Sequence, residues 1–114
     1  MSVDEAAPPS TAGLSLILTT VADATAARAL ASRLLAEGLA ACVQLQEIDS
    51  LYVWKGRVEE EDEVRMLIKT PSALLNAAMD AIARLHPYEV PQIVAVEASA
   101  VALPYLQWTL EVTR

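Results

Sequence analysis

The sequence predicts an α+β domain built in the order β-α-β-β-α-β, with a further helix near its C-terminal end. Three observations lead to this prediction. An apolar segment precedes an alanine-rich stretch with helical spacing, two long alternating segments flank one turn, and a second helical stretch precedes a last alternating segment. The 114 residues fit one domain. We expect a disordered tail at residues 1–13 and the domain at residues 14–114.

The first strand and the first helix are predicted between Leu14 and Gly38. Leu14–Thr20 is short, apolar and followed by a break, as in a buried strand. Asp23 is a suitable N-cap for a helix over Ala24–Glu37, where apolar residues recur every three or four positions. Gly38 supplies the C-terminal stop of that helix.

A long β-hairpin is predicted from Ala41 to Thr70. Lys55-Gly56 supplies its turn, because glycine accepts a positive φ. The acidic run Glu59–Glu63 on the returning strand would blunt an exposed edge by charge repulsion or attract divalent cations. Strands this long extend beyond a small domain and expose their edges, which favours pairing with another copy of the chain.

The second half of the chain completes the element order. The segment Thr70-Pro71-Ser72 is predicted to open a second helix, which ends near Leu85 because Pro87 disfavours a helical residue before it. Gln92–Ala98 is predicted as the last strand, and a short third helix begins at Pro104. This order is the ferredoxin-like split βαβ arrangement. Many unrelated functions use that fold, so it does not specify an activity.

Composition argues against two classes of partner. The formal net charge is −7, from 15 acidic and 8 basic residues, whereas nucleic acids and anionic membranes are bound through clustered lysine and arginine. The chain lacks the run of about twenty apolar residues that a membrane-spanning helix needs. Cys42 is the single cysteine, so the fold needs no intrachain disulfide. We therefore expect a cytoplasmic protein with no nucleic-acid partner and no membrane partner.

Three local sequences occur in a characteristic order and spacing. They are Leu39–Gln44, Ser50–Glu59 with the later Ile68–Thr70, and Leu85–Gln92 followed by Tyr105–Trp108. Together, over Leu14–Val112, they closely resemble the CutA family of divalent-cation tolerance proteins. The resemblance implies a compact homotrimer of ferredoxin-like subunits held together by the extended hairpins. It also implies an association with divalent metals, above all copper.

In enterobacterial members of that family, copper is associated with a cysteine shortly after the first strand and with a His-His pair before Pro-Tyr. The corresponding residues of this chain are Thr19, Leu85 and His86, so His86 alone is retained from that set. The family also often has a glutamate after the second proline, where this chain has Gln92.

The candidate metal ligands are His86 and Cys42. His86, the only histidine, could ligate a metal or act as a proton switch, or it could cap the second helix or bind a neighbouring carbonyl. Cys42 could bind Cu(I) as a thiolate or could be a small buried hydrophobe. If the two residues lie close together, they form a two-ligand site. In a trimer, symmetry could also bring together one residue from each subunit.

A ligand cleft at a subunit interface is the second candidate site. Its predicted residues are Trp54, Lys69, Tyr88, Glu89 and Trp108. Aromatic side chains are common anchors at subunit contacts, and a basic side chain beside them could hold a small anion between subunits. The alternative is that these residues only pack the core and the interface.

No catalytic residue is predicted, because the chain has no nucleophile elbow, no glycine-rich phosphate loop and no His-Cys zinc spacing. We expect a non-enzymatic, CutA-like homotrimer that binds Cu²⁺ or another divalent cation weakly and has no essential cofactor. One alternative is a PII-like trimeric signalling or scaffold protein with a small ligand at the subunit interface. Another is a minor hydrolase or isomerase that uses the same cleft.

Overall fold

The computed structural model describes residues 9–10 and 13–114. Most of the expected tail therefore lies outside the described residues, and its described strand β1 (Pro9–Ser10) pairs with β6 (Val101–Ala102). The other elements are β2 (Leu14–Val21), α1 (Ala24–Ala36), β3 (Cys42–Trp54), β4 (Arg57–Pro71), the 3₁₀ turn η2 (Ser72–Leu74), α2 (Leu75–Leu85), β5 (Ile93–Glu97) and α3 (Leu103–Glu111). None of the described helices is long and apolar enough to cross a membrane.

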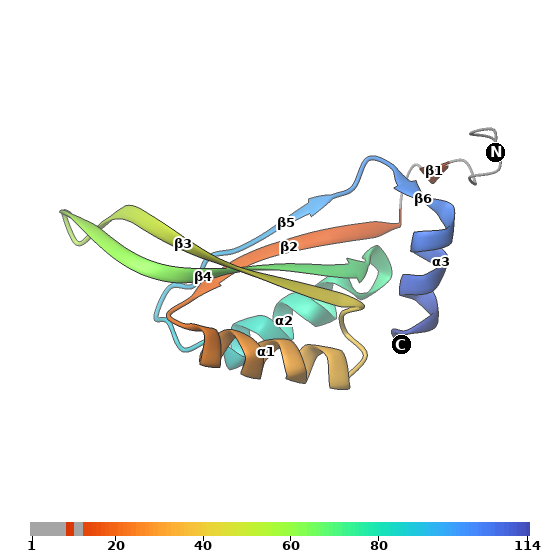
Figure 1. Cartoon of the computed structure of the whole chain (residues 1–114), viewed down its shortest axis with the longest axis horizontal. Coiled ribbons are helices and arrows are strands. Elements are labelled where there is room, and N and C mark those ends of the chain that lie inside the picture. Colours follow the sequence, from red (N-terminus) through yellow and green to blue (C-terminus); the bar gives the residue numbers. More distant parts are fainter. Residues whose placement is uncertain (1–8, 11–12) are drawn as a thin grey trace.

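Four strands form one antiparallel sheet in the order β3-β4-β2-β5. Figure 1 shows α1 and α2 on one face of this sheet and α3 at one end of it. Because side chains alternate between the two faces of a strand, Ile17 of β2 packs in the main core, whereas Leu14 packs with Leu106 of α3. Val94 and Val96 of β5 stay half exposed. The sheet therefore has one helix-covered face and one face that is largely open.

The predicted caps of the first helix are confirmed. The Asp23 side chain accepts a hydrogen bond of 2.8 Å from the Ala26 N–H, which satisfies one of the free donors at the start of α1. Gly38 follows the helix with a φ of +70°, a conformation that glycine adopts without steric penalty.

The predicted hairpin is also confirmed. β3 has 13 residues and β4 has 15, and φ is positive at both Lys55 and Gly56, 52° and 80°, as in the two-residue turn that matches strand twist. β2 ends at Val21, opposite Val64, so beyond that point β3 and β4 pair only with each other. Residues 48–63 project from the sheet as a two-stranded ribbon (Figure 1), here termed the hairpin arm.

The second helix begins later than the sequence predicts. Pro71 has an extended ψ of 139° and is the last residue of β4, opposite Leu14. The Ser72 N–H donates to the Gly13 carbonyl at 2.8 Å, and the 3₁₀ turn then leads into α2 at Leu75. Proline fixes φ but leaves ψ free, so strand pairing decides the conformation here.

Candidate functional site

His86 lies buried just after α2, and both of its ring nitrogens make hydrogen bonds. Nε2 is 2.8 Å from the Thr20 carbonyl oxygen, and because a carbonyl can only accept, Nε2 carries the proton. Nδ1 accepts a hydrogen bond of 3.2 Å from the Tyr88 N–H. The neutral ring therefore joins the end of β2 to the loop after α2, and ligation of a metal would break one of these bonds.

Cys42 does not come close to His86 within one subunit. Cys42 and Leu16 are both register partners of Lys69, whereas His86 binds Thr20. Thr20 lies four residues beyond Leu16, roughly 13 Å along the strand. Among the described residues, no three His, Cys, Asp or Glu side chains are grouped so that they could hold a metal ion.

Two of the three family positions associated with copper, Thr19 and Leu85, offer no soft ligand in this chain. Thr19 is fully buried in β2, and its Oγ1 has no hydrogen-bond partner among the described residues. Leu85 packs against the main core at the end of α2. Neither side chain supplies the sulfur or imidazole nitrogen that soft and borderline metals prefer.

Tyr88 connects the loop after α2 to β4. Its hydroxyl donates a hydrogen bond of 2.8 Å to Glu63 Oε2, and its ring meets the His86 ring in an edge arrangement with the centroids 4.8 Å apart. Glu63 is buried, which a charged residue rarely is unless it has a partner. Burial of Tyr88, and then the hydrogen bond to the Glu63 carboxylate, raises the pKa of the Tyr88 hydroxyl well above its ordinary value.

The residues predicted for a ligand cleft do not gather in one place within one subunit. Apart from the adjacent Tyr88 and Glu89, only Lys69 and Trp108 come near each other, because Lys69 Nζ lies 5.5 Å from the centroid of the Tyr105 ring and the Trp108 ring lies 5.6 Å from it. Trp54 is at the hairpin tip, opposite residue 57, whereas Lys69 is at the other end of β4. These positions are roughly 40 Å apart along the strand. Trp108 is exposed on α3, and Tyr88 and Glu89 lie in the loop after α2. A cleft that contains all five side chains therefore needs more than one subunit.

An acidic cleft of about 510 Å³ lies at the base of the hairpin arm. Its carboxylates come from Asp23, Glu47, Asp49, Asp62 and Glu63. Asp49 and Asp62 are register partners, and the hydrogen bond to Asp62, followed by the charge of Asp62, raises the pKa of Asp49. The acidic run on β4 was the only local signal of this cleft, because strand pairing brings the other carboxylates to it.

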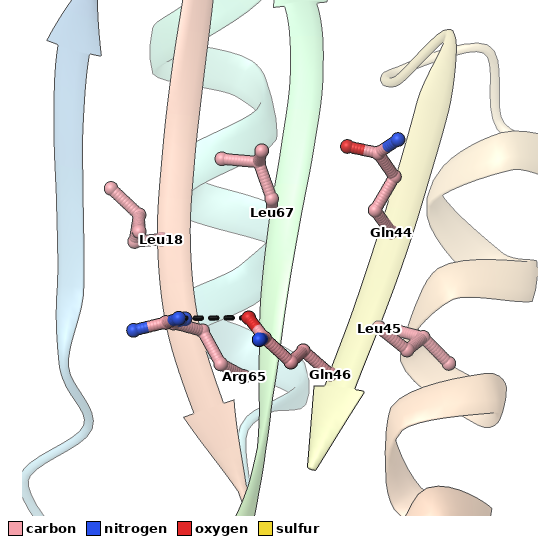
Figure 2. Close-up of a pocket in the computed structure, with 6 residues that line it drawn as sticks. All are labelled: Leu18, Gln44, Leu45, Gln46, Arg65 and Leu67. Atoms are coloured by element: carbon pink, nitrogen blue, oxygen red, sulfur yellow. Dashed lines mark hydrogen bonds between the residues drawn. The ribbon is translucent and has the colours of Figure 1, made fainter. Parts of the chain in front are cut away.

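The open face of the sheet carries a groove of about 240 Å³ that the sequence pattern did not predict. Its lining residues are Leu18, Gln44, Leu45, Gln46, Arg65 and Leu67. Figure 2 shows Arg65 and Gln46 turned toward each other across neighbouring strands, and Arg65 Nη2 donates a hydrogen bond of 2.8 Å to Gln46 Oε1. The sequence around Arg65 alternates like any strand and does not indicate a groove, because the residues that line it with Arg65 come also from β2 and β3.

Residues 15–112 match the family model described as CutA1 divalent ion tolerance protein. The chain belongs to the CutA family. It is 36% identical over 99 residues to the divalent-cation tolerance protein CutA of Pyrococcus horikoshii, covering 87% of this chain and 97% of that protein. It is 44% identical over 88 residues to human protein CutA, covering 76% of this chain and 49% of that protein. The chain spans about half the length of the human, Bos taurus and Mus musculus relatives.

Solved structures of CutA proteins have the same fold. The structure of CutA from Synechococcus elongatus PCC7942 superposes with a TM-score of 0.86 at 35% identity, over 90% of this chain and 91% of that chain. A CutA from Archaeoglobus fulgidus, described as periplasmic, superposes with a TM-score of 0.85 at 31% identity, over 89% of this chain and 99% of that chain. The family therefore includes a member with another stated location, and a cytoplasmic location of this chain stays a prediction.

Proposed function

We propose that this chain acts as a non-catalytic homotrimer in divalent-cation tolerance and binds divalent cations, Cu²⁺ among them, weakly. The observation that carries the proposal is the hairpin arm, which projects from its own sheet (Figure 1) and carries acidic residues at its base. The family and the names of its members supply the link to divalent cations. The proposed location is the cytoplasm.

Three features support assembly into a homotrimer of ferredoxin-like subunits. The strand order β3-β4-β2-β5 agrees with the split βαβ arrangement. β3 is an edge strand over its full length, and such an edge readily pairs with another chain. The hairpin arm also exposes apolar side chains: Leu51 is 67% exposed, and Val53 and Val58 are each 71% exposed. A surface of this kind is typical of a subunit interface.

The acidic cleft is the proposed place of weak cation contact, which would act through its negative charge, since among the described residues of one subunit no three of its carboxylates are grouped as ligands. Divalent cations prefer carboxylate oxygens, and the closely paired Asp49 and Asp62 raise the local negative charge. The bonds at both nitrogens of His86 make that residue a poorer candidate. Cys42 is half-buried and free and is the remaining candidate for a soft ion such as Cu(I).

Calorimetric titration with Cu²⁺ tests this assignment. Variants Asp49→Asn and Glu47→Gln should weaken binding, whereas His86→Ala should leave the affinity unchanged. Cys42→Ala tests the soft-ligand alternative, and Asp80→Asn on the exposed face of α2 is the matched control. Loss of binding only in His86→Ala or Cys42→Ala would move the site away from the acidic cleft. Light scattering coupled to gel filtration measures the oligomeric state, and a monomer would contradict the trimer.

The PII-like alternative receives no support from the family match or from the relatives and structures compared. A thermal-shift panel of nucleotides and small anions tests it, because a ligand that binds only the native state raises the melting temperature. No shift is the expected result.

A further inference from the structure

Arg65 carries a charge with no charged partner among the described residues of its own subunit. Among the described residues the ion pairs are Arg33–Glu37 and Arg57–Glu59, whereas the partner of Arg65 is the neutral amide oxygen of Gln46. The chain has 15 acidic residues against 8 basic ones, so carboxylates are plentiful. An arginine that pairs with none of the described carboxylates has its pairing capacity free for another molecule.

Arg65 lies on an exposed apolar face of the sheet, so a surface that covers this face must also provide a partner for the guanidinium. Figure 2 shows Leu18 and Leu67 on the same open face of the sheet as Arg65, and Val94 and Val96 beside them on β5 are 50% and 49% exposed. An apolar face of this kind is stabilised when another surface covers it. Covering the guanidinium without a carboxylate would be strongly unfavourable, because a buried charge needs a partner.

The hairpin arm carries two carboxylates that repel each other. Asp49 and Asp62 are exposed register partners on β3 and β4, and like charges directly opposite each other destabilise a strand pair. The raised pKa of Asp49 reflects this proximity. A guanidinium presents two parallel N–H groups to carboxylate oxygens, so one arginine can satisfy such a pair.

Arg65 and the Asp49–Asp62 pair cannot meet within one chain. Asp62 and Arg65 are three residues apart on β4, so they point to opposite faces of the strand and their backbones are about 10 Å apart. The same offset separates Asp49 from Gln46, the register partner of Arg65. The arm that holds the acidic pair projects away from its own sheet (Figure 1). A second copy can bring this pair to Arg65.

We propose that Arg65 of one copy binds the carboxylates of Asp49 and Asp62 on the hairpin arm of a neighbouring copy. The proposal rests on the homotrimer proposed above and assigns the residues that make its contact specific. This contact would also reduce the electrostatic repulsion between subunits. Subunits with a net charge of −7 repel one another, so their assembly needs cationic groups placed opposite carboxylates.

A double-mutant cycle on the assembly tests the proposal. The variants are Arg65→Met, the pair Asp49→Asn with Asp62→Asn, and all three together, measured by sedimentation equilibrium in buffer with a chelator, since divalent cations would compete for the carboxylates. Arg65→Met and the paired variant should each weaken assembly about tenfold or more, and the combined variant should be no weaker than the worse of the two. Arg65→Gln is a second replacement that keeps a polar surface.

Matched controls remove the same charges elsewhere. Arg28→Met on α1 and the pair Asp80→Asn with Glu111→Gln change exposed residues outside both surfaces and should leave assembly unchanged. A wild-type monomer overturns the homotrimer and this contact together. A wild-type trimer that is unaffected by both Arg65 variants overturns this contact alone. Purely additive losses in the combined variant also overturn it, because Arg65 would then act on a different partner.

Discussion

The Tyr88 hydroxyl donates a hydrogen bond of 2.8 Å to Glu63 Oε2 and thereby joins the loop after α2 to the base of the hairpin arm. Glu63 is buried and its carboxylate borders the acidic cleft. The adjacent His86 bonds to the end of β2 from the same loop. This short segment therefore fixes the position from which the hairpin arm projects.

Tyr88→Phe removes the hydroxyl and leaves the buried carboxylate of Glu63 without this partner. We expect the free energy of unfolding at neutral pH to fall by about 1–3 kcal/mol, as for other hydrogen bonds to charged groups. Urea unfolding followed by circular dichroism measures it. Tyr105→Phe is the matched control, because the Tyr105 hydroxyl has no hydrogen-bond partner among the described residues, and an equal loss in that variant would contradict the assignment.

The pH dependence of stability should change in the same variant. The pKa of Tyr88 is raised in the folded protein, so above about pH 10, the ordinary tyrosine pKa, the unfolded chain loses this proton while the folded chain keeps it. The contribution is fully present below that pH and is lost as pH rises further. Wild type should therefore lose more stability than Tyr88→Phe as the pH rises from about 10 to about 11.5. Parallel curves for the two proteins would contradict the pKa direction.

His86→Ala should be destabilising, although we expect it to leave any copper affinity unchanged. It removes the partners of the Thr20 carbonyl and of the Tyr88 N–H at once, which should lower the free energy of unfolding by about 2–4 kcal/mol. Arg84→Ala, at an exposed position of α2, is the control, and we expect it to change stability by less than about 0.5 kcal/mol. Thermal melts without added metal give both values. A His86→Ala protein as stable as wild type would show that the ring is not structural.

Thr19→Val should stabilise the protein. The Thr19 hydroxyl is fully buried without a partner among the described residues, and valine has nearly the same shape without a polar group. We expect a gain of about 1–2 kcal/mol in the free energy of unfolding. Thr19→Ser keeps the hydroxyl and loses a methyl group, so it should lower that free energy by about 1 kcal/mol. A loss in Thr19→Val would indicate that the hydroxyl has a partner, such as a buried water.

The turn of the hairpin arm offers a test of backbone strain. Lys55 adopts a φ of 52°, and asparagine tolerates this conformation better, so Lys55→Asn should raise the free energy of unfolding by about 0.5–1 kcal/mol. Gly56→Ala should lower it by about 1–2 kcal/mol. A Cβ at Gly56 would meet no heavy atom within 4 Å, so its effect isolates the backbone. Chemical denaturation of both variants measures the difference, and effects of the same sign would contradict the turn geometry.

The element order and the hairpin could be predicted because they depend on local patterns. Apolar spacing located both long helices and the first strand, Asp23 and Gly38 marked the ends of α1, and Lys55-Gly56 marked the turn. The start of α2 was missed because Pro71 is compatible with either a strand or a helix, and pairing with β2 decides between them. The pairing of β1 with β6 was missed because two residues carry no periodicity.

The candidate sites could be predicted only as residue types. The sequence identified His86 and the acidic run as chemically capable groups, and motif order identified the family. It could not show that both nitrogens of His86 are engaged or that Glu63 binds Tyr88. Nor could it show that Arg65 lies on an apolar face without a carboxylate.

The sequence by itself therefore determined the order of the elements, their approximate ends and the family. The tertiary structure decided which polar groups are already satisfied and which remain available. The physical reason is that periodicity and turn chemistry act over a few neighbouring residues. The partners of a side chain such as Arg65 are set instead by strand register and by which face of the sheet it occupies, and these bring together residues distant in the chain.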